Sequence, residues 1–303
     1  MNNEKMVINW LKQCQATGVL PWEYDFKQEV FGQKSWTLAF NENPVKRILE
    51  KDSGFYGNPS CETEDSMLAQ AIYQIVWQTY SKNVIHEVPG DCDADVMNSF
   101  WMLFKNFTVN QGGSFFEAAQ AIYPRSRFPN KGVFSDEDEK SRRLLAAYQP
   151  YGAKKGDTWS SLILKNYETK FKVLDNQNLQ KLAKLSHTIG NFTLTPKGFN
   201  YTGTDEKHLK HNDSYNTWSE ALHNLNELEE WSTNRYLDCS SWDAYCEKFL
   251  MADYEKEYAY ETKPEQQDVF LEQINTAIEN RGKQIIKMLC DQLGYKYLEA
   301  NDF

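Results

Sequence analysis

The chain has 303 residues, of which 14% are aromatic, so it is long enough to bury a large core without disulfide or metal staples. No apolar run approaches the ~20 residues that cross a bilayer, and the first residues lack the basic flank and apolar stretch of a signal peptide. We therefore expect a cytoplasmic protein without a membrane partner.

The net charge of −10 is unevenly distributed along the chain. Residues 1–100 carry 8 basic and 14 acidic side chains, residues 101–210 carry 17 and 10, and residues 211–303 carry 8 and 19. The basic middle either forms an anion-binding face or neutralises its acidic neighbours within the fold. The second arrangement is the commoner one.

Several protein classes are disfavoured by motifs that the sequence lacks. The six cysteines are scattered and include no C-x-x-C pair, so neither a zinc ribbon nor a secreted disulfide framework fits, and we expect reduced thiols. There is also no phosphate-binding glycine loop, G-x-S-x-G, H-E-x-x-H or EF-hand loop. The enzyme classes that carry these motifs are therefore not expected.

Apolar residues at helical spacing predict several helices in the first half of the chain. Asp91 or Asp93 is expected to cap a further helix that includes Val96. A loose alternation of aromatic residues predicts an N-terminal hairpin over 24–40. The helices predicted from spacing cover 3–16, 44–51, 63–81 and 115–122.

The second half is also predicted to be helical, with start signals at 135–138 and at Thr158. Gly152 to Gly156 is the expected flexible break, so 152–156 is where the chain would subdivide. Together these features predict a single domain over 1–303 of the mainly α (α+β) class, with a few short strands. The remaining predicted helices cover 179–186, 217–231, 242–251 and 266–293.

The chain is organised around residues 186–200, where a helical pattern gives way to alternation. Alternating residues predict a short half-buried strand over 191–195, from Asn191 to Thr195, with Phe192 and Leu194 facing the core. Gly190 before the strand and 196–198 after it are turn signals.

Histidines in and after this segment are the first candidates for chemistry. His187 could act as a general base or metal ligand, or could hydrogen-bond a backbone group at a helix end. His208 and His211, three residues apart, could share a helix face and hold a metal ion, or could lie in a solvated loop. In both cases the structural alternative is the commoner one.

Amide and basic side chains are the second group of candidates. Asn191 and Asn200 could orient a catalytic histidine, because an amide fixes a tautomer by accepting its N–H, or could satisfy turn backbone. Lys197 could meet a phosphate as a point charge. Arg125 and Arg127, in a basic loop, could bind an anion in the same way.

The segment Ile189-Gly190-Asn191-Phe192-Thr193-Leu194, followed by Pro196 and Asn200, resembles the iGNLTLl…N segment of the HNH-like C-terminal nuclease domain of GmrSD-type restriction enzymes. It is also similar to bacterial and phage proteins with an HTIGNF segment. Those nuclease domains end on a helix with an I..R element, and Ile278-Glu279-Asn280-Arg281 stands at the corresponding place. The family's upstream His-Ile-x-Pro corresponds here to Ala121-Ile122-Tyr123-Pro124, with alanine in place of the histidine.

The resemblance implies a nuclease of the host–phage conflict type that acts on nucleic acid with a divalent metal, Mg²⁺ or Zn²⁺, and no other cofactor. His187 or His208 would activate water, and Asn191 would orient that histidine. The missing histidine and the net charge favour the alternative, a catalytically inactive protein that keeps the fold and binds a protein or nucleic-acid partner. The basic middle of the chain holds the motif, which favours the nuclease-like protein.

Overall fold

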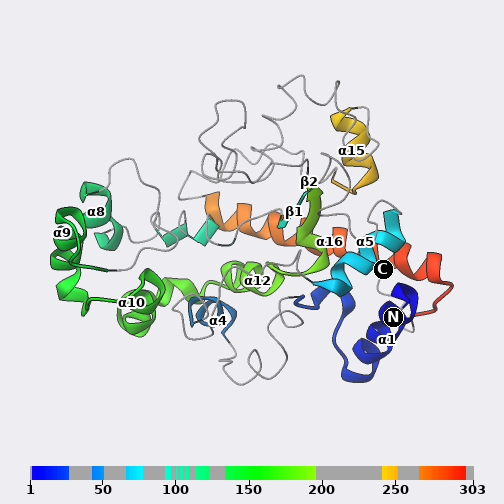
Figure 1. Ribbon diagram of the computed structural model, residues 1–303, viewed down its shortest axis with the longest axis horizontal. Helices are drawn as coiled ribbons and strands as arrows, with labels where there is room; N and C mark the ends of the chain where they lie inside the picture. Colours follow the sequence, from blue (N-terminus) through cyan, green and yellow to red (C-terminus); the bar gives the residue numbers. More distant parts are fainter. Residues whose placement is uncertain are drawn as a thin grey trace.

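The computed structural model is mainly helical, as the sequence predicts (Figure 1). The hairpin expected over 24–40 and the helix expected over 217–231 lie almost entirely or wholly outside the described part of the chain. The structure describes residues 2–26, 43–50, 66–77, 93–96, 100, 103–104, 107–108, 114–122, 134–195, 241–251 and 266–297.

The long helix α16 (Gln267–Leu293) runs through the middle of the molecule and organises its packing (Figure 1). One face of it is lined by isoleucines and other apolar residues at helical spacing, and that face is buried. Gly294, in the left-handed conformation at φ 59°, ends the helix. The elements packed on α16 include α5 (Met67–Trp77), α12 (Gln177–Leu185) and two short 3₁₀ helices, η1 (Pro21–Glu23) and η6 (Ile189–Asn191).

Two N-terminal helices complete this central part. The helix α1 (Asn3–Thr17) is capped by the side chain of Asn2 and ends at Gly18, and its buried face packs on α5. The helix α4 (Pro44–Glu50) starts at a proline, as its sequence predicts, and packs on α12.

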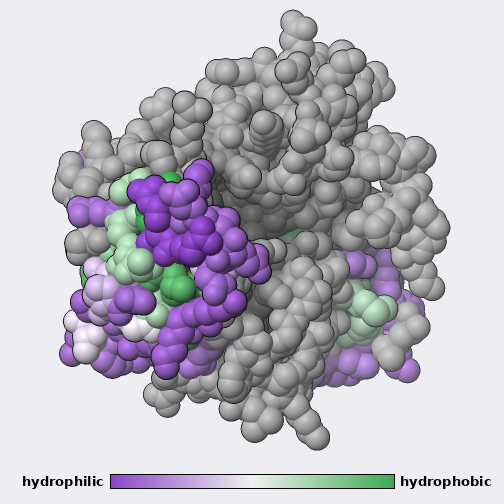
Figure 2. All heavy atoms as spheres, turned by 60° about the vertical axis from the view of Figure 1, so that its left-hand side comes forward, coloured by the Kyte–Doolittle hydropathy of each residue, from purple (hydrophilic) through white to green (hydrophobic). Residues whose placement is uncertain are grey.

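A second group of helices lies at one end of the molecule, on the left of Figure 1. Asp138 caps α9, and Thr158 caps α10 through a capping box with Ser161, so both predicted start signals are used. Hydrophilic residues cover much of the described surface of this end, with smaller apolar areas between them (Figure 2). The helices of the group are α8 (Ser114–Ile122), α9 (Glu139–Tyr148), α10 (Trp159–Lys165) and α11 (Tyr167–Lys170).

Aromatic rings form the interior of this end. Phe115 packs edge-on against Tyr148, Tyr151 and Phe171, with ring centroids 4.8–4.9 Å apart. Trp159 lies against both Tyr148 and Phe134. We call these six residues the aromatic cluster.

Two strands, β1 (Asp93–Val96) and β2 (Phe192–Thr195), form an antiparallel pair in which Asp95 lies opposite Thr193. The prediction that Asp91 or Asp93 caps a helix containing Val96 is therefore wrong for 93–96. These four residues lack a strong local preference, and their pairing with β2, about a hundred residues later, decides their conformation.

The predicted strand over 191–195 is confirmed from Phe192 onward, while Asn191 ends a 3₁₀ turn. The expectation that the strand is half-buried is wrong. Thr193, on the face predicted to be polar and exposed, is as completely buried as Phe192. Tyr245 of α15 (Trp242–Lys248) covers that face.

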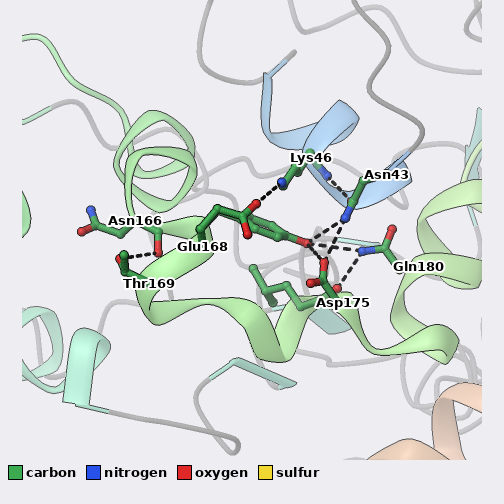
Figure 3. A network of polar contacts seen from close by, with 9 residues as sticks. Asn43, Lys46, Asn166, Glu168, Thr169, Asp175 and Gln180 are labelled. Atoms are coloured by element: carbon green, nitrogen blue, oxygen red, sulfur yellow. Dashed lines mark hydrogen bonds and ion pairs between the residues drawn. The ribbon is translucent and has the colours of Figure 1, made fainter.

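A polar network joins α4 to the segment that leads into α12 (Figure 3). The Tyr167 hydroxyl donates to an Asp175 carboxylate oxygen 3.0 Å away and accepts from the amides of Asn43 and Gln180. The Lys46 ammonium lies 4.4 Å from the centre of the Tyr167 ring and pairs with Glu168. Burial raises the pKa of Tyr167, so this hydroxyl stays protonated near neutral pH.

Two lysines of the basic middle pair with glutamates of the acidic ends of the chain. Lys181 bonds Glu279 at 2.6 Å, and Lys184 pairs with Glu23. In these contacts the basic middle neutralises acidic residues from both ends of the chain. Residues 134–195 carry 10 basic and 7 acidic side chains.

Among the described helices, none has the length and apolarity needed to cross a membrane.

Candidate functional site

The loop between α12 and β2, residues 186–191, carries two predicted site residues, and most of its main-chain carbonyls are hydrogen-bonded. Each main-chain carbonyl from Leu185 to Gly190 accepts a hydrogen bond. The donors include the Thr188 hydroxyl, the Asn191 side chain and the Phe26 amide. Such extensive pairing leaves the loop few alternative conformations.

Asn191 is buried and holds this loop from inside. Its side-chain nitrogen donates to the Ser186 carbonyl at 2.9 Å, and its main-chain N–H donates to the Thr188 carbonyl at 3.0 Å. The amide therefore acts on the backbone of the loop. Its predicted role of orienting a histidine side chain stays a prediction.

His187 lies in the same loop and is half-buried. Its carbonyl accepts from the Phe26 N–H at 3.0 Å, which ties the loop to the end of the N-terminal segment. This hydrogen bond fixes the backbone at the histidine, and the residue as a whole keeps part of its surface exposed. A general base must come within hydrogen-bond reach of the proton that it abstracts.

Arg281 of α16 is the charged residue at the centre of the site. Its Nη1 donates to the carbonyls of Gly190 at 2.9 Å and Phe192 at 2.8 Å, and makes a longer contact to Ile189 at 3.4 Å. Its Nε donates to the Phe249 carbonyl at 2.9 Å. We call Arg281 with these four carbonyls the arginine clasp.

The arginine clasp is buried, because Arg281 is only 2% exposed. Among the described residues no carboxylate pairs with the guanidinium, and its Nη2 has no hydrogen-bond partner there. A buried cation needs compensation, and here carbonyl dipoles provide it in place of an acid.

Two tyrosines extend the clasp. The Tyr73 hydroxyl donates to the Phe192 carbonyl, which Arg281 also binds, and the Tyr245 hydroxyl lies 3.4 Å from the Thr193 hydroxyl. Burial raises the pKa of both tyrosines, against the lowering effect of the nearby Arg281 charge. Both hydroxyls therefore remain protonated near neutral pH and act only through hydrogen bonds.

A glycine contact lets the loop reach α16 so closely. A Cβ atom added at Gly190 would overlap the Ile278 carbonyl oxygen, and one added at Gly282 would lie 3.0 Å from the Trp22 Cβ. Both glycines therefore allow the close approach of the loop backbone to α16.

The other six predicted site residues all lie outside the described part of the chain. The structure therefore neither joins them to His187 and Asn191 nor separates them. They are Asn200, Lys197, Arg125, Arg127, His208 and His211.

The described ranges contain no cluster of metal-ligating side chains. Within those ranges, no three His, Cys, Asp or Glu side chains gather closely enough to hold one. The described residues alone do not fit a metal centre, and a divalent metal remains an expectation from the resemblance.

Sequence reasoning from composition and spacing missed Arg281, Tyr73 and Tyr245. Arg281 was noted only within the I..R element of the resemblance, and its contact with Gly190 could not be read from spacing. One usable signal is Arg281 next to Gly282 on the mainly apolar face of a helix, because a buried arginine requires a special environment.

Comparison of the chain with protein-family models, with curated proteins and with solved structures finds no match in any of the three.

Proposed function

We propose that the chain is an HNH-nuclease-like protein of the host–phage conflict type, with phosphodiester hydrolysis as its activity. One observation supports this most strongly. The two segments that resemble the nuclease family, 189–194 and 278–281, are about 90 residues apart in sequence and are in contact through Arg281. A chance likeness of two separate segments gives no reason for such contact.

The candidate residues fall into two groups, those that hold the loop in place and those proposed to take part in the reaction. Arg281 and Asn191 are buried and bonded to carbonyls, so they hold the site and do not meet a phosphate. His187 is half-buried and is proposed to carry the chemistry, because a neutral imidazole near pH 7 can accept the proton of an attacking water. Lys197, Arg125 and Arg127 are proposed to bind the phosphates, with His208 and His211 as metal ligands.

The second candidate is a catalytically inactive protein that keeps the fold and binds a nucleic acid or protein partner. Alanine at position 121, where the resembling nucleases have their histidine, favours it. The arginine clasp would be as necessary to such a protein as to an enzyme, since it stabilises the loop regardless of chemistry.

Incubation of the protein with DNA and RNA in the presence of Mg²⁺, Mn²⁺ or Zn²⁺ tests the first candidate. His187→Ala is a suitable variant because it removes the imidazole and keeps the carbonyl bond to Phe26. His208→Ala and His211→Ala test the metal ligands, and a thermal melt checks that each variant is folded.

Cleavage that is lost in His187→Ala and in chelator would support the nuclease. Cleavage retained by His187→Ala would move the chemistry to another residue. Absence of cleavage with every substrate and metal would favour the binding protein. If the binding protein recognises nucleic acid, its affinity should fall steeply between ~50 and ~200 mM salt. If it binds no nucleic acid even at low salt, the partner is a protein.

A further inference from the structure

We infer that Arg281 is a positioning residue for His187, which it reaches only through the backbone of the loop. The inference rests on the proposed function in one respect, namely that His187 carries the chemistry. The structural part, that Arg281 sets the position of the histidine, stands on hydrogen bonds alone.

The first step runs from Arg281 to both sides of Asn191. Its Nη1 binds the carbonyl of Gly190, immediately before Asn191, and that of Phe192, immediately after it. One planar guanidinium therefore holds two peptide units, the one between Gly190 and Asn191 and the one between Phe192 and Thr193, on either side of Asn191.

The second step runs from Asn191 to both sides of His187. The Asn191 side chain binds the carbonyl of Ser186, and its main-chain N–H binds the carbonyl of Thr188. The histidine lies between these two contacts in the sequence. In addition, the Phe26 N–H donates to the carbonyl of His187 itself.

The helix that carries Arg281 cannot move independently of this loop. Gly190 rests directly on the α16 backbone beside Ile278, so the guanidinium and the loop are locked at a fixed separation. A lysine at position 281 would keep the positive charge but lose the fork of donors that binds several carbonyls at once. Arg281→Lys therefore separates charge from geometry.

The test compares the full-length parent with Arg281→Lys, using Arg142→Lys as a matched control. Arg142 is exposed on α9 and makes a 3.4 Å contact to the Asp136 carbonyl, far from the loop in sequence. Hydrogen exchange is measured at the amides of Asn191 and, as a remote reference, Leu11. The imidazole resonance of His187 is assigned by comparison with His187→Ala.

In folded Arg281→Lys we expect exchange at the Asn191 amide to rise tenfold or more, with little change at Leu11. The His187 resonance should shift, while Arg142→Lys matches the parent in every readout. If the parent cleaves nucleic acid, kcat of Arg281→Lys should fall more than KM rises.

A folded Arg281→Lys protein with unchanged Asn191 exchange and an unmoved His187 resonance would overturn the inference. An equal rise in exchange at Leu11 and Asn191 would do the same, because it would mark a merely global loss of stability. If Arg281→Lys does not fold, Tyr73→Phe takes its place, since it removes one donor from the Phe192 carbonyl and keeps the arginine. A parent that cleaves nothing would refute the nuclease but leave the exchange and resonance readouts to decide the positioning role.

Discussion

The same tyrosine–phenylalanine unit occurs in two regions of the molecule. In the aromatic cluster, Tyr148 packs edge-on against Phe115, with ring centroids 4.9 Å apart, and its hydroxyl donates to the Phe115 carbonyl. In the arginine clasp, Tyr73 packs edge-on against Phe192 at 5.0 Å, and its hydroxyl donates to the Phe192 carbonyl. The two units differ only in what surrounds them.

The surroundings decide what each region can tolerate. Other aromatic rings surround the Tyr148–Phe115 unit. The stability of such ring packing depends on the area buried, and the packing adapts to small changes of shape. Arg281 and Thr193 adjoin the second unit, and their hydrogen bonds depend on direction and on a buried charge. We therefore expect the clasp to be less tolerant of substitution than the aromatic cluster.

The largest effect is expected for Gly190→Ala. The added methyl group would overlap the Ile278 carbonyl, so the loop or α16 must move and the clasp must open. We expect a loss of more than about 4 kcal/mol in the free energy of unfolding, or no folding, as measured by urea denaturation. Gly152→Ala is the control, since its Cβ would meet open space. Only the positive φ of 78° is unfavourable for alanine there, and it should lower the free energy of unfolding by about 1 kcal/mol. Equal costs for the two variants would contradict the close contact.

Phe192→Ala and Phe115→Ala compare the two units directly. Each removes a buried ring, and large-to-small core changes of this kind cost about 3–5 kcal/mol. Chemical denaturation of both variants measures the loss. An unchanged midpoint for Phe192→Ala would show that β2 does not face the core as described.

Removal of a single hydroxyl sharpens the comparison. Tyr73→Phe should cost about 2 kcal/mol, because the lost group lies beside the buried Arg281 charge, whereas Tyr148→Phe should cost about 1 kcal/mol. Thermal melts of the two variants at equal protein concentration give the difference. A larger cost for Tyr148→Phe would reverse the expected ranking of the two regions.

Alkaline pH should lower the free energy of unfolding by a smaller amount than these substitutions, because buried thiol and tyrosine groups resist ionisation in the folded state. Burial raises the pKa of the Cys14 thiol from 9.0 to about 12, and it also raises the pKa of Tyr73. Because the unfolded thiol ionises first, its contribution is complete below pH 9 and is lost progressively as pH rises toward 12. We expect Cys14 alone to account for a loss of about 1 kcal/mol in the free energy of unfolding between roughly pH 9 and 10, so Cys14→Ala should lose less than the parent over this range. A stability that is flat to pH 11 would contradict this.

Local signals made much of the fold predictable from the sequence. The predicted helices begin and end close to the observed ones where a cap was visible, as at Asp138, Thr158 and Gly18. Capping and helical spacing involve residues within one or two turns, so a single sequence contains the information.

Features that depend on distant contacts were not predictable. The strand β1 exists because it pairs with β2, and Thr193 is buried because Tyr245 covers it. In the candidate site, the sequence placed His187 and Asn191 on one turn but gave no sign that Arg281 would bind its carbonyls. Spacing along the chain carries no information about which backbone groups a buried side chain will reach.

The glycine contact described above has a consequence for recognising relatives of this chain. Gly190, Arg281 and Gly282 form a three-position fingerprint, since a Cβ at Gly190 would overlap the α16 backbone, one at Gly282 would crowd Trp22, and the arginine binds the loop from the neighbouring helical position. The segment between the two glycines contributes only the carbonyls of Phe192 and Phe249 to the arginine clasp. A distant relative should therefore be sought as a Gly-Asn turn paired with a late helical Arg-Gly, even where the intervening segment cannot be aligned.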